Sequence, residues 1–180
     1  MRSEKAAQAN EARAKASVES LVRAAQGGSQ LAFEELYARF HKVVHATVLA
    51  RVSASDADDL VQDAFSDAWA KLGSLRTAAA FPGWLRTLAR NLAIDHRRKF
   101  GPVKEVDDLA IEPPPVSEAL AALRALRELP PTYAETLAMR LIEGLSGPEI
   151  AERTGMTPES VRVNLHRGFK LLRAKLGGGR

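Results

Sequence analysis

Three arginines lie along one side of a helix that the sequence predicts over residues 81–99. At 100° per residue, Arg86, Arg90 and Arg97 share one face. The opposite stripe is apolar and consists of Phe81, Trp84, Leu85, Leu88 and Leu92. No acid stands four residues from Arg86 or Arg97, so intrahelical ion pairs do not account for them. This face, with Arg98 and Lys99 at the helix end, predicts a phosphate-backbone contact; a solvated, dipole-compensating surface is the alternative.

A second cationic surface is predicted near the C-terminus, on the later of two short helices joined by a tight turn. Ser146 and Glu149 have the spacing of a capping box. Gly155 turns the chain, and Thr157 with Pro158 starts the final helix. Its inner stripe is predicted to be Val161, Leu165, Leu172 and Leu176, and its outward residues are Glu159, Arg162, Val163, His166, Arg167 and Lys170. This pattern is typical of a DNA-binding helix-turn-helix; a structural helical hairpin is the alternative.

An acidic row is predicted on a helix that starts with Ser55 as its cap and runs to about Leu72. The row consists of Asp56, Asp59, Asp63 and Asp67. Like charges four residues apart cost a helix a few tenths of a kcal/mol per pair, so the row is unfavourable as pure structure. It therefore indicates a basic protein partner, with a plain solvated face as the alternative.

Composition excludes several chemistries. The 180 residues include no cysteine, which excludes disulfides, thiolate catalysis and cysteine-containing zinc sites. His41 and His45 are spaced as a metal pair, but no third ligand stands nearby, so we expect a solvated helix flank and neither metal nor cofactor. No nucleophile with a supporting base is evident, so no enzyme activity is predicted. Without a membrane-length apolar run or a signal core, the protein is expected to be cytoplasmic.

The helical patterns divide the chain into two small all-α domains with a linker between them. Residues 1–16 are expected to form a disordered arm, and residues 17–99 a helical domain with Ser17 and Ser29 among its caps. Proline, glycine and acids predict an acidic tether over residues 100–117. Helical patterning returns after Ser117, giving a second domain over 118–176 and a tail over 177–180.

In this order, the segments resemble the group IV, or extracytoplasmic-function (ECF), sigma factors of bacterial RNA polymerase, within the sigma-70 family. DADDLVQDAFSDAWAKL resembles sigma region 2.2, and FPGWLRTLARNLAIDHRRK resembles regions 2.3 and 2.4. LPPTYAETLAMRLIEGLSGPEIAERTGMTPESVRVNLHRGFKLLRAKL resembles region 4. The resemblance implies a factor that binds core polymerase and directs promoter-specific transcription initiation. The first domain would recognise and melt the −10 element, and the helix-turn-helix would recognise the −35 element.

The resemblance also implies partners and the residues that contact them. The polymerase β′ coiled coil would bind Asp59, Gln62, Asp63 and Asp67, and the β subunit is a further expected partner. The −10 DNA would contact Ser74, Leu75, Arg76, Arg86, Arg90, Asn91, Arg97, Arg98 and Lys99. The −35 DNA would contact Thr157, Ser160, Arg162, Val163, Asn164, His166, Arg167 and Lys170. An anti-sigma factor is also expected as a partner.

Two other functions are weighed against this interpretation. A one-component helix-turn-helix regulator would need a ligand pocket or a dimer interface in residues 17–99, and it would have no use for the row of aspartates. A DNA recombinase would need a nucleophile with a base or a metal cluster, for which the sequence offers no candidate. Co-purification with core polymerase separates the sigma-factor interpretation from both.

Overall fold

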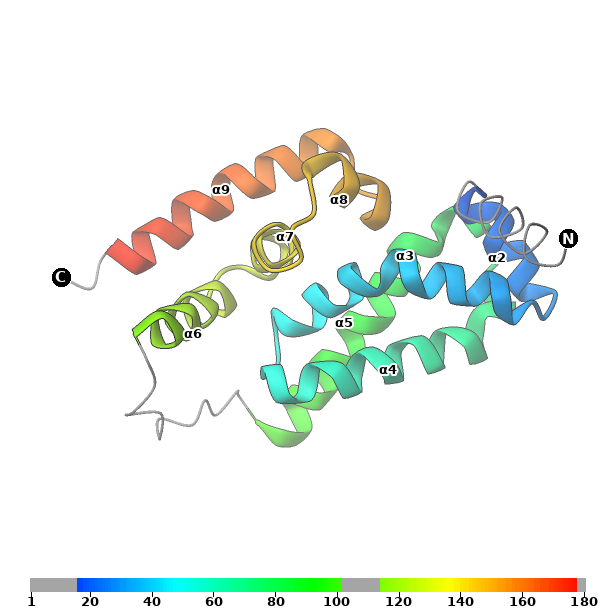
Figure 1. Ribbon diagram of the computed structural model, residues 1–180, viewed down its shortest axis with the longest axis horizontal. Helices are drawn as coiled ribbons and strands as arrows, with labels where there is room; N and C mark the ends of the chain where they lie inside the picture. The colour runs from blue at the N-terminus through cyan, green and yellow to red at the C-terminus, as the bar shows by residue number, and fades with distance from the viewer. Residues whose placement is uncertain (1–15, 102–113, 178–180) are drawn as a thin grey trace, which may run out of the picture.

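The computed structural model describes residues 16–101 and 114–177, and every regular element in these ranges is helical (Figure 1). The longer elements of the N-terminal half are α2 (Val18–Gln26), α3 (Gln30–Leu49), α4 (Ala54–Lys71) and α5 (Phe81–Phe100). The short 3-10 turns η1 (Leu72–Ser74) and η2 (Ala78–Ala80) connect α4 to α5. The C-terminal half contains α6 (Pro114–Arg127), α7 (Pro131–Leu141), α8 (Gly147–Thr154) and α9 (Pro158–Gly177). The predicted all-α fold class is confirmed, whereas the predicted N-terminal arm lies almost wholly outside the described residues.

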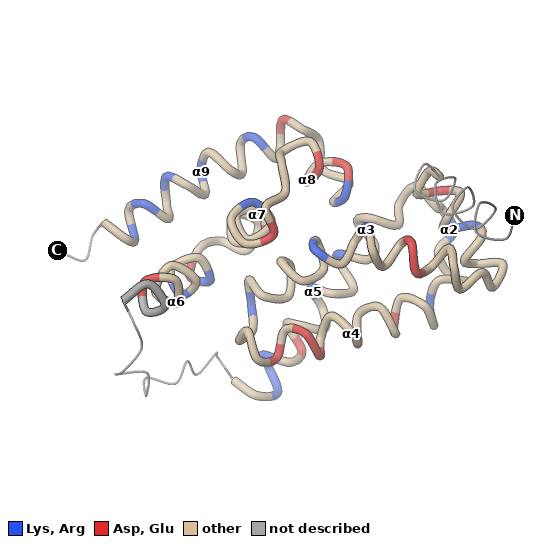
Figure 2. The backbone as a smooth tube through the Cα atoms, viewed as in Figure 1, with Lys and Arg blue, Asp and Glu red and all other residues tan. Residues whose placement is uncertain are grey.

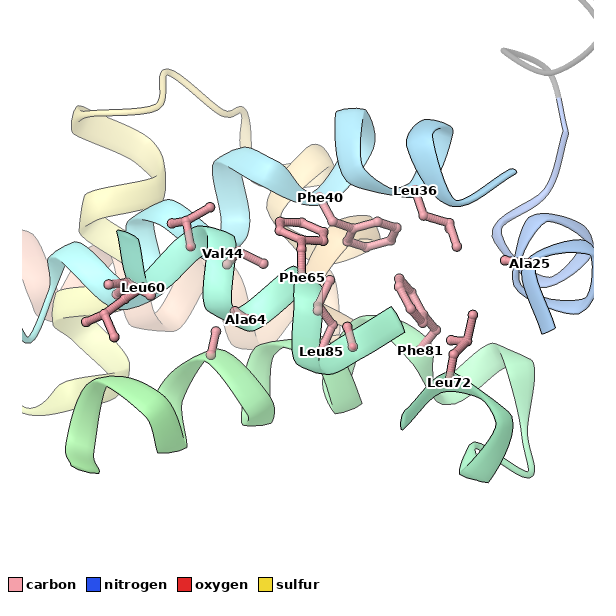
Figure 3. Packing of buried hydrophobic residues seen from close by; sticks show 14 of the residues in the cluster. Ala25, Leu36, Phe40, Val44, Leu60, Ala64, Phe65, Leu72, Phe81 and Leu85 are labelled. Carbon is pink, nitrogen blue, oxygen red and sulfur yellow. The ribbon is translucent and has the colours of Figure 1, made fainter. Parts of the chain in front are cut away.

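Aromatic residues from three helices form the centre of the N-terminal core (Figure 3). Phe40 of α3 and Phe81 of α5 are both buried, and their ring centroids lie 5.2 Å apart, edge to face. Phe65 of α4 is buried beside them. Pro82 occupies the first turn of α5, where its missing N–H costs no hydrogen bond. The apolar stripe predicted for residues 81–99 therefore does face a core.

Two predicted helix starts are wrong. The cap of α4 is Ser53 and not Ser55, because Ser53 has an extended backbone and its side chain accepts a hydrogen bond from the backbone N–H of Asp56. Ser55 lies inside the first turn. Helix α6 begins at Pro114, before the predicted start after Ser117. Prolines are tolerated in the first turn of a helix. The end of the segment predicted to be a tether is therefore the start of a helix.

Helices α7 and α9 pack closely in the C-terminal half. A Cβ added to Gly168 would stand 3.0 Å from Leu137 Cδ1, so only a glycine allows this approach without rearrangement. Val161 and Leu172 of α9 are buried, as predicted. The prediction for Leu176 is wrong: this side chain is half exposed in the last turn of α9.

The two halves share helix α3, which lies between α4 and α7 (Figure 1). One side of α3 contributes Phe40, Val44 and Val48 to the N-terminal core. Its other side contributes Val43, Ala46 and Ala50 to the core of the C-terminal half. This second buried side has a weak apolar signal in the sequence, because two of its three members are alanines.

A buried cluster of charges crosses the same boundary. Glu135 of α7 is only 2% exposed, and its carboxylate accepts hydrogen bonds from Arg51 and from Arg90 of α5. The bonds from Arg90 Nε and Nη2 measure 2.9 Å and 2.8 Å, a bidentate pair. Arg51 is itself buried and also donates to the carbonyl of Thr47. One carboxylate therefore connects α5, the end of α3 and α7.

Replacing Glu135 by alanine should destabilise the packing of the two halves. Arg51 would be left buried without a counter-charge, and removing one partner of a buried pair costs about 3 kcal/mol or more. We expect the thermal unfolding midpoint to fall by several degrees. Glu128→Ala, which breaks a surface pair to Lys175, is the matched control and should cost less than about 1 kcal/mol. Equal midpoints for the two variants would contradict the structural role of Glu135.

Candidate nucleic-acid interface

The predicted acidic row follows the surface of α4, where red segments mark it in Figure 2. Asp59, Gln62 and Asp63 are exposed. Within residues 16–101 and 114–177, neither Asp59 nor Asp63 makes an ion pair. Asp67 pairs with Lys71 one turn away, at 2.6 Å. Asp56 is used differently, because it accepts a hydrogen bond from the cap residue Ser53. The carboxylates of Asp59 and Asp63 on this surface are therefore available to bind another molecule.

Helices α8 and α9 form the predicted helix-turn-helix. The capping box of α8 is complete: the Ser146 hydroxyl accepts from the Glu149 N–H, and the Glu149 carboxylate accepts from the Ser146 N–H. These hydrogen bonds from Ser146 lower the pKa of Glu149, since they favour its charged form. Gly155 ends α8 with φ of 71°, a left-handed conformation that glycine adopts without strain.

Four of the predicted −35 residues lie together on α9. Arg162, Val163, His166 and Arg167 line one shallow hollow of about 430 Å³. The first turn of the helix is held by Thr157, whose hydroxyl accepts from the Ser160 N–H at 3.1 Å. Arg167 and Lys170 are exposed, whereas Asn164 is only partly so. Blue bands follow α9 along its length in Figure 2, so this helix presents cations to the solvent.

The arginine face of α5 is divided between solvent and the C-terminal half. Arg90 donates to Glu135, and Arg86 Nη1 lies 3.0 Å from the sulfur of Met156, which follows the turn after α8. Burial lowers the pKa of Arg86, and the hydrogen bond to Glu135 raises that of Arg90. Arg97 and Lys99 are exposed near the end of α5, and Arg98 pairs loosely with Asp95 at 3.5 Å.

The remaining predicted −10 residues lie at separate places. Ser74, Leu75 and Arg76 precede α5, whereas Arg97 to Lys99 lie at its far end. A 20-residue helix is about 30 Å long, so these groups are not one compact site. Asn91 is exposed between them. The segment before α5 is held by Gln26, whose side-chain amide donates to the carbonyls of Leu72 and Leu75. Sequence reasoning missed Gln26, because nothing in its local pattern points to a loop 46 residues away.

The histidine pair does not gather metal ligands. His41 and His45 stack with ring centroids 6.1 Å apart, but Nδ1 of His45 bonds to Glu143 across the boundary between the halves. Among the described residues, no group of three candidate metal ligands occurs. The described helices also include none with the length and apolar character needed to span a membrane.

Comparisons with known proteins identify the family of this chain. Residues 36–101 match the family Sigma-70 region 2, and residues 119–172 match Sigma-70, region 4. RNA polymerase sigma factor CarQ of Myxococcus xanthus is 32% identical over 163 residues, which cover 83% of this chain and 92% of CarQ. The chain belongs to the RNA polymerase sigma factors. ECF RNA polymerase sigma factor SigM of Mycobacterium tuberculosis is 30% identical over 87% of this sigma factor and 83% of SigM.

Solved structures agree with this assignment. The structure of CnrH in complex with the cytosolic domain of CnrY superposes with a TM-score of 0.62 at 26% identity, covering 91% of this sigma factor and 99% of the CnrH chain. The matched families lie in the order that the sequence resemblance predicted, and the relatives include named ECF factors. These matches support a sigma factor and not a one-component regulator.

Proposed function

We propose that this ECF sigma factor binds core RNA polymerase through the acidic face of α4 and binds promoter DNA through two cationic surfaces. The observation that carries the proposal is the separation of charge. Asp59 and Asp63 are exposed on α4 and have no partner among the residues that the structure describes, whereas Arg162 and Arg167 lie on α9. DNA would be repelled by the first surface and attracted by the second. A basic segment of the polymerase, the β′ coiled coil, fits the first.

The factor has no catalytic step of its own in this proposal. Core polymerase, including its β and β′ subunits, forms the phosphodiester bonds, and the sigma factor selects where synthesis begins. Its place of action is accordingly the cytoplasm, at the nucleoid. A sigma factor of this kind needs no metal or cofactor, because its contribution is binding energy alone.

Recognition of the −35 element is assigned to the start of α9. Thr157, Ser160, Arg162, Val163, Asn164, His166, Arg167 and Lys170 are the proposed contacts. A recognition helix reads base edges with residues near its N-terminus, and arginine binds guanine with two hydrogen bonds. The hollow lined by Arg162, Val163, His166 and Arg167 supports this assignment, because it places these four side chains next to one another on one face of α9.

Recognition of the −10 element is assigned to the segment before α5 and to the exposed cations of that helix. Ser74, Leu75, Arg76, Arg86, Arg90, Asn91, Arg97, Arg98 and Lys99 are the proposed contacts. Holding a base outside the stacked DNA helix costs a few kcal/mol of free energy. Contacts between that base and this region would have to offset the cost. Arg86 and Arg90 are turned toward α8 and α7 in the packed chain, so their use on DNA requires the halves to part.

The spacing of the two promoter elements leads to the same requirement. Elements centred near −10 and −35 are separated by about 25 base pairs, or about 85 Å of B-form DNA. In the packed chain, a Cβ on Gly155 would stand only 3.9 Å from the backbone nitrogen of Gly83 in α5. The helix-turn-helix and the start of α5 therefore cannot reach both elements at once in this arrangement. We propose that the packed form is the resting form and that promoter binding opens it.

An anti-sigma factor is a further proposed partner. CnrH, whose structure resembles this chain, was solved in complex with the cytosolic domain of CnrY. By analogy, an inhibitor of this sigma factor would bind both halves and prevent it from reaching polymerase.

Reversing charge on α4 tests the polymerase interface. We expect Asp63→Lys with Asp67→Lys to weaken binding of the full chain to core polymerase by about tenfold or more, because like charges would meet at the coiled coil. Pull-down by core polymerase and fluorescence anisotropy with a −35 duplex are the measurements, and the duplex affinity should not change. Glu34→Lys with Glu118→Lys, two exposed acids elsewhere, is the matched control. If the α4 variant bound core polymerase as tightly as the unmodified chain, the proposed interface on α4 would be contradicted.

Truncating Arg167 tests direct readout of the −35 element. Arg167→Ala should reduce discrimination between the preferred duplex and single-base variants by about 1 to 3 kcal/mol, because a bidentate contact to a base is lost. Competition binding with a set of duplexes at fixed salt measures it. Arg173→Ala, a change farther along α9, should at most weaken binding to all duplexes by the same factor. The same uniform loss from Arg167→Ala would make Arg167 a phosphate contact.

A further inference from the structure

A cleft lined by five arginines lies between the two halves of the molecule. Its volume is about 660 Å³, within the range of small-molecule sites. Arg51, Arg90, Arg97, Arg98 and Arg127 line it. They come from the end of α3, from α5 and from α6, so the cleft exists only while the halves are packed together. Ile94, Leu129 and Pro131 supply an apolar wall.

The cleft has a surplus of positive charge. No carboxylate is among its lining residues in the described parts of the chain. Glu135 pairs with two of the lining arginines, so its single carboxylate is shared between Arg51 and Arg90. Within the described ranges, Arg98 makes only the loose pair with Asp95. Burial lowers the pKa of Arg127, whose Nε donates to the carbonyl of Leu49. Among the described residues that line the cleft, guanidinium groups therefore outnumber carboxylates.

The start of α7 adds a second feature that favours anions. Pro131 and Thr132, the first two residues of this 11-residue helix, line the cleft. No side chain caps this helix end. The positive end of the α7 dipole therefore points at the space that the arginines surround. Two elements, the guanidinium groups and the start of α7, therefore line the same cleft.

We propose that this cleft binds a small anion carrying condensed phosphate groups, which bridges α5 and the start of α7 and stabilises the packed form. Guanidinium groups bind phosphate oxygens in pairs, and several phosphates in one ligand match several arginines on different elements. Because the ligand contacts both halves, it binds the packed form in preference to the open form. By linkage it raises the free energy needed to separate them.

The test is direct binding to the full chain, without polymerase or promoter, so its failure leaves the proposed function standing. Inorganic tripolyphosphate is titrated calorimetrically at fixed ionic strength, with orthophosphate and sulfate as comparison anions. We expect saturable binding at one site, with tripolyphosphate about tenfold or more tighter than orthophosphate. ATP is titrated in parallel: tighter binding than tripolyphosphate assigns the site to nucleotides, and equal or weaker binding assigns it to free polyphosphate.

Three variants locate the site. Arg97→Gln with Arg98→Gln removes cations from α5, and Thr132→Glu places a carboxylate at the start of α7. Thr132 is exposed, and acids are favourable in a first helical turn, so this variant tests the site without removing a buried group. Each is expected to weaken tripolyphosphate binding by about tenfold. Arg23→Gln with Arg173→Gln removes two exposed cations outside the cleft and should change affinity by less than about twofold.

Four results would overturn the proposal. One is the absence of saturable tripolyphosphate binding at millimolar concentration. Another is an equal loss in the control and in the cleft variants, which would indicate diffuse attraction to a basic surface. The third is an effect of the α5 variant without any effect of Thr132→Glu, since the ligand would then not bridge the halves. A mixed-sequence single-stranded oligonucleotide that binds the cleft where tripolyphosphate does not would also exclude a small-anion site.

Discussion

The arrangement of this sigma factor depends on one buried carboxylate. Glu135 lies between Arg51 and Arg90, and each of its partners belongs to the other half of the molecule. Ion pairs out of water are strong when complete and costly when one partner is removed, so the cluster favours a single packed geometry. The charge count also matters. Two guanidinium groups share one carboxylate, and the surplus contributes to the positive cleft beside them.

Local features were predictable because their physics acts within a few residues. The capping box at Ser146 and the turn at Gly155 both occur where the sequence predicts them. The same reasoning places the cap of α4 at Ser55, whereas the observed cap is Ser53. Only the observed extended backbone of Ser53 distinguishes the true cap. The family order and the helix-turn-helix were likewise recoverable from short motifs.

Long-range pairs were not predictable. Arg90 shares a face of its helix with Arg86 and Arg97 and is predicted to contact DNA, yet its partner Glu135 is 45 residues away. The second buried side of α3 was missed because alanine carries a weak apolar signal, although Ala46 and Ala50 are buried there. Which surfaces of two small helical units meet depends on shape and charge in three dimensions. The proposed DNA contacts on α5 therefore depend on the packing of the halves, and those on the outward side of α9 do not.

The central claim is that the packed form is a resting form that opens on promoter binding, and a distance measurement tests it most directly. The native chain has no cysteine, so spin labels on Ala38→Cys and Glu152→Cys attach only there. Both positions are exposed, and neighbours of the first line the same small cavity as Glu152. The account predicts a short label-to-label distance in the free chain and an increase of several tens of ångströms with core polymerase and promoter DNA. An unchanged short distance in a transcribing complex would contradict it.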